Sequence, residues 1–230
     1  MIKENLEFKY KFVFPDGKVK EFQIKLAADS LQYIGKKKFL LPGWTKLKFN
    51  QCRRCDLPPE TKNCPVAVNL YPIMETFKSL NSFDKCQVIL ETAERTYSKH
   101  ATLQQGISSM IGIIMATSGC PILSKLKPMV RFHLPFASPQ ENLYRAISMY
   151  LVQEYFKYKR DEKPDWDLHG LTKTYEKVHE VNVSFAKRLA AMQKDADVNA
   201  LIVLDNLANY VNFSLDRDRL KGIEDLFKDL

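Results

Sequence analysis

The first part of the chain alternates between apolar and polar residues with the period of a β-strand. Apolar side chains occupy every second position over residues 6–14, a Pro15-Asp16-Gly17 turn follows, and the alternation resumes over residues 22–26. Because successive side chains of a strand point to opposite faces, this pattern predicts a β-hairpin with one buried face over residues 6–26. Further strands are expected at residues 44–49, 86–91 and 96–101.

The apolar period then changes to that of helices, with apolar residues three or four positions apart. This spacing predicts helices over residues 66–80, 103–118, 139–159, 171–192 and 198–211. Ser138-Pro139-Gln140-Glu141 is a capping box with proline at the first helical position. Ser214 is expected to cap a final amphipathic helix.

These patterns together predict an α+β fold, in which N-terminal antiparallel β-hairpins pack on a C-terminal helical bundle. We expect a β-rich part with the cysteine cluster over residues 1–102 and a helical bundle over residues 103–230. The two parts are expected to form one folding unit.

Asn182 occupies a position of the 171–192 helix where an apolar residue is expected, one turn from His179. Asp205 lies in the next predicted helix. A His–Asp pair in an apolar bundle is suited to general acid–base catalysis or to metal binding. We favour a buried, hydrogen-bonded network that fixes the register of the two helices.

Four of the five cysteines can form one metal site. Cys52-Arg53-Arg54-Cys55 is a Cys-x-x-Cys turn, which directs two thiols to the same side, and Cys64-Pro65 follows after a proline-containing loop. Proline favours the first position of a helix, so Cys64-Pro65 and Cys120-Pro121 would place two sulfurs at helix N-caps. Backbone N–H groups there favour the thiolate that metals require.

Zinc is the expected metal, because structural zinc sites use four thiolates. An iron–sulfur cluster is the alternative, although the spacing matches neither ferredoxin pattern. A redox disulfide or ordinary buried thiols are further interpretations. Cys120 is the favoured fourth ligand over His133, His100 and Cys86, and Cys86 and His133 are expected to serve the core.

Composition excludes several classes of protein. The 230 residues are 45% hydrophobic and 27% charged, which is typical of a globular chain, and no stretch is long and apolar enough for a membrane span. The odd cysteine count argues against a secreted disulfide framework, and no signal peptide is visible, so a reducing cytoplasm is expected. Phosphate-loop, serine-hydrolase and zinc-protease motifs are missing.

The formal charge of +8 is concentrated in the N-terminal part, where residues 1–50 contain 11 lysines against five acids. Such a surface could contact nucleic acid or an acidic partner. An ordinary lysine-rich surface also explains it and is the interpretation that we favour.

Five short segments share a resemblance to known sequences. They are residues 63–70 (Asn-Cys-Pro-Val-Ala-Val-Asn-Leu), 94–97 (Glu-Arg-Thr-Tyr), 116–121 (Ala-Thr-Ser-Gly-Cys-Pro), 131–136 (Arg-Phe-His-Leu-Pro-Phe) and 179–182 (His-Glu-Val-Asn). The chain from about Cys52 onward resembles a bacterial family known only as a domain of unknown function. The resemblance implies no activity, substrate or cofactor.

The first functional hypothesis is therefore a cytoplasmic metal-binding protein whose four-cysteine site is mainly structural. The second is a redox or catalytic protein that carries an iron–sulfur cluster. The third is a nucleic-acid-binding module that uses the basic N-terminal part, with an affinity that falls steeply with salt.

Overall fold

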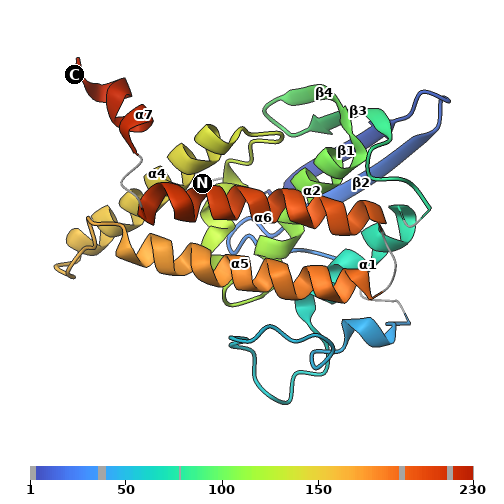
Figure 1. The fold of residues 1–230 in the computed structure, drawn as a ribbon, viewed down its shortest axis with the longest axis horizontal. Coiled ribbons are helices and arrows are strands. Elements are labelled where there is room, and N and C mark those ends of the chain that lie inside the picture. The colour runs from blue at the N-terminus through green and yellow to red at the C-terminus, as the bar shows by residue number, and fades with distance from the viewer. Residues whose placement is uncertain (1–3, 36–39, 78, 192–194, 217–219, 230) are drawn as a thin grey trace.

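The fold is α+β, as the sequence predicts, with a four-stranded antiparallel sheet followed mainly by helices (Figure 1). The computed structural model describes residues 4–35, 40–77, 79–191, 195–216 and 220–229. The sheet has the order β2-β1-β3-β4. Its strands are β1 (Leu6–Val13), β2 (Val19–Leu26), β3 (Lys85–Glu91) and β4 (Thr96–Thr102).

The sheet buries the face that the alternation predicts. Tyr10 of β1 lies opposite Phe22 on one side and Leu90 on the other, and both Tyr10 and Leu90 are almost inaccessible to solvent. The predicted hairpin over residues 6–26 and the predicted strands at residues 86–91 and 96–101 are confirmed.

The helices follow the predicted apolar spacing. They are α1 (Pro65–Phe77), α2 (Leu103–Thr117), α3 (Lys127–Arg131), α4 (Pro139–Tyr158), α5 (His169–Ala190), α6 (Asp195–Asp216) and α7 (Lys221–Glu224), with 3-10 turns η1 (Gly43–Thr45), η2 (Leu123–Leu126) and η3 (Asp225–Phe227). The capping box that opens α4 is confirmed: the Glu141 N–H donates to Ser138 Oγ, and the Glu141 carboxylate accepts from the Ser138 N–H. Within the described residues, none of these helices has the length and apolar character needed to cross a membrane.

The predicted cap at Ser214 is wrong. Ser214 is a buried residue inside α6, which continues to Asp216. The apolar pattern of residues 198–211 extends to Leu215, which packs against the core, so the helix does not stop where the serine suggests an N-terminus.

The helices cover one face of the sheet and then pack on one another. α2 lies directly on the sheet at Gly106, where a Cβ atom would lie 2.6 Å from a Phe12 ring carbon and 2.8 Å from a Val88 methyl carbon. Any side chain there would push α2 away from the sheet. α6 packs against α2, α4 and α5, and α5 runs beside α6 along the length of the molecule (Figure 1).

Candidate metal centre

The segment between η1 and α1 carries three of the cysteines. The predicted strand at residues 44–49 is wrong. These residues form the end of η1 and the turns that follow it, with one isolated bridge between Lys46 and Asn63. The buried side chains Trp44 and Leu47 are three residues apart, which suits a turn rather than a strand. None of residues 48–63, all of which the structure describes, is buried. This loop, which lies beneath α5 in Figure 1, has no apolar core of its own.

Cys52 and Cys55 form the tight turn that their spacing predicts. The Cys55 N–H donates to the Cys52 carbonyl at 3.2 Å. The Ser184 side chain of α5 hydrogen-bonds to Cys52, and Arg54 forms an ion pair with Glu180 of the same helix at 3.4 Å. These contacts hold the turn against α5.

Cys64 lies at the N-terminus of α1, as predicted. The N–H groups of Val66 and Ala67 donate to its sulfur, and its own N–H donates to the Thr45 carbonyl at 2.8 Å. Helix N-termini leave such N–H groups without partners, so the thiol receives donors that α1 itself cannot use.

Cys120 occupies an equivalent corner after α2. Gly119 has the left-handed φ of +89° that ends a helix, and the N–H groups of Ile122 and Leu123 donate to the Cys120 sulfur. The segment that follows is the 3-10 turn η2 rather than the α-helix that the Cys-Pro pair suggests.

The four thiols are close enough to influence one another electrostatically. Burial, together with the smaller effect of the neighbouring Cys64, Cys120 and Cys55 thiols, raises the pKa of Cys52 to about 12. Burial is also the main cause that raises the pKa of Cys64 and of Cys120, and Cys64 and Cys55 add to the effect on Cys120. Thiols from three separate chain segments therefore face one region of the molecule.

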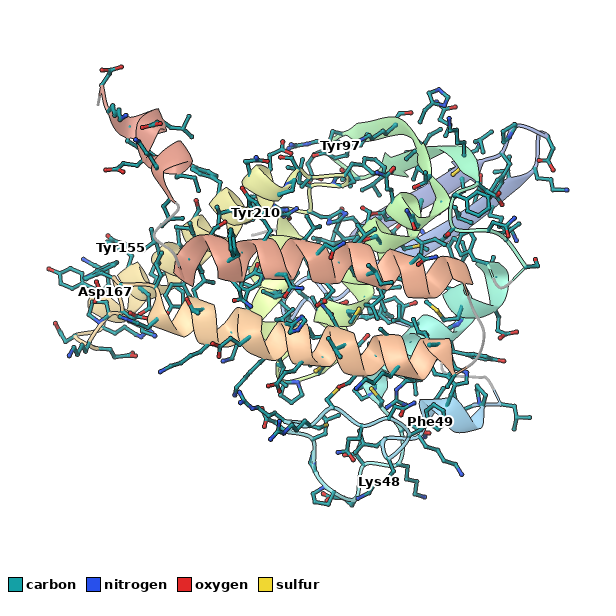
Figure 2. All side chains as sticks on the ribbon, viewed as in Figure 1. Lys48, Phe49, Tyr97, Tyr155, Asp167 and Tyr210 are labelled. Carbon is teal, nitrogen blue, oxygen red and sulfur yellow. The ribbon has the colours of Figure 1, made fainter. Side chains whose placement is uncertain are left out.

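The thiols do not form a closed cluster. All five cysteines are free, so no disulfide links them. In the part of the chain that the structure describes, only Asp165, Asp167 and His169 have three ligand atoms that all lie within 4.8 Å of one another, so each set of three cysteine sulfurs has at least one longer separation. Asp167 lies at the opposite end of the molecule from Phe49, which belongs to the cysteine loop (Figure 2).

Arg188 of α5 is a buried cation beside these thiols. It is 2% exposed and donates to the carbonyls of Trp44, Lys46 (2.8 Å) and Leu47 (3.4 Å). Burial lowers the pKa of Arg188, and Cys64, Cys52 and Cys55 act in the opposite direction. No carboxylate in the described residues lies within ion-pair distance of this guanidinium.

Sequence reasoning missed both Arg188 and Ser184. The available signal was the position of Arg188 beside Phe185 and Leu189, on the apolar side of α5. A lone arginine there is indistinguishable in sequence from a cation that complements the C-terminal end of a helix dipole.

The other three candidate ligands are His133, Cys86 and His100. His133 Nε2 lies 2.9 Å from the Tyr10 hydroxyl and 3.2 Å from Ser109 Oγ, which confirms the predicted hydrogen-bonded core histidine. Cys86 is buried on β3, as predicted, and His100 is exposed on β4.

The predicted polar set on α5 and α6 is confirmed only in part. His179 Nδ1 lies 2.8 Å from an Asp205 carboxylate oxygen, which confirms the hydrogen bond, but the two side chains are 39% and 20% exposed, so the predicted burial of this pair is wrong. Asn182 is buried, but its side chain makes no hydrogen bond among the described residues. The reason is positional, because Asn182 points into a cavity between the helices rather than toward the pair.

Residues 8–228 match the model of a protein family described as "Domain of unknown function (DUF6901)". No curated protein and no solved structure matches the chain.

Proposed function

Since the chain belongs to the DUF6901 family, a domain of unknown function, any function must come from the site itself, and we propose that this is a metal-binding protein. Its centre is held by Cys52, Cys55, Cys64 and Cys120, and its role is mainly structural. A metal bound there would join the 48–63 loop to the start of α1 and to the end of α2.

The observation that supports the proposal most is that four free, partly buried cysteines come from three chain segments, and that Cys52, Cys64 and Cys120 pack against the same core. Protonated thiols need no such convergence, because a cysteine alone is a small core residue. Backbone N–H groups at Cys64 and Cys120 suit sulfurs that become negative when they bind a metal.

Arg188 supports the same conclusion through charge. A buried cation without an anionic partner is costly, whereas four thiolates around a metal carry a net negative charge. Arg188 would then be the counter-ion of the centre, held in place by the Trp44, Lys46 and Leu47 carbonyls.

The spread of the sulfurs bears on the identity of the metal. Zinc–thiolate bonds of about 2.3 Å in a tetrahedron place every sulfur pair about 3.8 Å apart. Each set of three sulfurs here has at least one separation above 4.8 Å, which is longer than a tetrahedral zinc site allows. A cluster with several irons holds its thiolates farther apart, because each thiolate binds a different iron. We therefore propose an iron–sulfur cluster first. Zinc, which the four-thiolate set favours, is the second candidate and would require the loop to close.

The test is metal analysis of untagged protein purified with and without exclusion of air. The expected result is iron and inorganic sulfide in equal amounts, with a brown colour that fades in air. One zinc ion per chain in a colourless protein would support the same four ligands but show that the metal is zinc rather than an iron–sulfur cluster.

Matched variants test the ligands. Cys52→Ser and Cys120→Ser should lose the metal, whereas Cys86→Ser, which changes a buried thiol outside the site, should retain it. The absence of stoichiometric metal in both preparations would refute the proposal, as would full metal content in Cys52→Ser.

A further inference from the structure

A second feature, separate from the thiols, is a partly open cavity of about 260 Å³ between α2, α3, α5 and α6. Most of its wall is apolar, with contributions from Ile113 and Met115 of α2, Val178 of α5 and Leu204 and Leu207 of α6. An apolar cavity of about 150 Å³ is already large enough to hold benzene, so this one has room for a larger ligand.

The charges at the cavity all have one sign. Among its described lining residues, Arg145 and Lys99 are charged, and no Asp or Glu is present. His133 also lines the cavity and is neutral, because burial lowers its pKa to about 3. Glu141 is the carboxylate that interacts electrostatically with Arg145, and it already accepts a hydrogen bond from the Ser138 N–H in the α4 capping box.

Arg145 has hydrogen-bonding capacity left for a ligand. Its guanidinium donates to the carbonyls of Met129 (2.9 Å) and Phe132 (3.0 Å) and to Asn142 Oδ1 (3.5 Å). These three bonds fix its orientation. A guanidinium has five N–H donors, so about two stay without a partner among the described residues.

Two further polar groups at the cavity are poorly satisfied. The Tyr175 hydroxyl has only the Met129 sulfur, at 3.7 Å, as a partner in the described chain, and a thioether is a weak acceptor. Asn182, 3% exposed, has no hydrogen bond among the described residues. Buried polar groups normally find partners, so these two indicate a ligand with polar atoms.

We propose that this cavity binds a small carboxylic acid with an apolar body. Its carboxylate lies at Arg145, with the Tyr175 hydroxyl as a second donor, and its apolar part lies between α2 and α6. Two cations without a lining acid select an anion, and the apolar wall selects a hydrocarbon chain or ring. The inference does not depend on the metal centre.

The test is titration of the whole protein with octanoate, followed by calorimetry or by NMR chemical shifts, with 1-octanol as the uncharged probe of equal chain length. Saturable binding of octanoate, at least about tenfold tighter than binding of 1-octanol, is expected from the charge-assisted hydrogen bonds. No saturable octanoate binding, or equal binding of the two probes, would overturn the proposal.

Variants locate the site. Arg145→Gln should weaken octanoate binding about tenfold or more, whereas Arg131→Gln, which removes an arginine that does not line the cavity, should leave it unchanged. If Arg145→Gln does not fold, Ala116→Leu tests the site instead, because a larger side chain on α2 narrows the cavity and leaves Arg145 unchanged. Unchanged octanoate binding in a folded Arg145→Gln or Ala116→Leu protein would refute this site.

Discussion

Arg188 is the single residue whose charge constrains the candidate centre most. Its guanidinium donates to the carbonyls of Trp44, Lys46 and Leu47, and its cation lies beside the cysteines. One residue of α5 therefore supports both the backbone that leads into the cysteine loop and the charge of the thiols.

Replacing Arg188 with methionine should release the metal and lower the free energy of unfolding by about 3 kcal/mol, because the anionic centre loses its buried counter-ion and the carbonyls lose their donor. Arg188→Lys should recover only part of this, since an ammonium cannot reproduce the guanidinium fork. Metal content and urea unfolding measure both effects. Lys187→Met, at the exposed neighbouring position, is the control, and equal behaviour of the two methionine variants would contradict the assignment.

His133 predicts a pH dependence of stability. Burial, with Arg145 nearby, lowers its pKa to about 3, below the ordinary value of 6.5. Below pH 6.5 the unfolded chain therefore takes up a proton that the folded chain does not, so stability falls as the pH falls. Between pH 7 and pH 5 the loss from this residue should be up to about 2 kcal/mol.

Urea unfolding of the native protein and of His133→Gln at several pH values isolates this effect, because other groups titrate equally in both. The difference in stability between the two proteins should shrink from pH 7 to pH 5. A constant difference would show that His133 is not held neutral in the fold.

At the scale of elements, α5 serves two sites at once. Ser184 and Arg188 near its C-terminal end face the thiols, and Tyr175 and Asn182 face the cavity. Its regular apolar spacing holds both sets on one rigid helix, so a change at either site leaves the backbone of the other in place.

Asn182→Leu should raise the free energy of unfolding by about 1 kcal/mol, because it replaces a buried polar group that lacks a partner among the described residues. Asn206→Leu, an exposed change on α6, should stay within about 0.5 kcal/mol of the native protein. Chemical unfolding measures both. Clear destabilisation by Asn182→Leu alone would mean that the amide has a bonding role.

Elements with a strong apolar period were predictable from sequence, and irregular ones were not. The hairpin over residues 6–26, α4 and α5 follow their spacing closely, because burial of one face decides the structure there. The predictions for residues 44–49 and for Ser214 were wrong for different reasons. The first has two apolar residues that only a turn brings to the core, and the second is a good cap that tertiary packing places inside α6.

At the scale of the whole molecule, the sequence predicted that Cys64 and Cys120 lie at corners of the chain, but it did not show that these two corners approach each other. The Cys64 and Cys120 positions follow from local rules about proline and glycine. Their approach to each other depends on how α1 and α2 pack, and the Arg188 contacts depend on α5 crossing the loop. Sequence spacing carries no information about such long-range contacts, so the counter-ion and the cavity were not predictable.

The last prediction concerns the 48–63 loop in the whole protein. Arg53 and Arg54 are exposed there, and none of the loop residues is buried, so the order of the loop should depend on the metal. Removing the metal with a chelator should speed tryptic cleavage after Arg53 or Arg54 about tenfold or more, while the far-ultraviolet circular dichroism of the sheet and bundle changes little, because only Phe49 and Cys52 of the loop pack against their shared apolar core. Cys86→Ser should respond to the chelator as the native protein does, and Cys52→Ser should be cleaved rapidly without it. Equal cleavage rates in native protein with and without chelator, after metal analysis has shown that the metal is gone, would mean that the loop is held by its contacts with α5 alone.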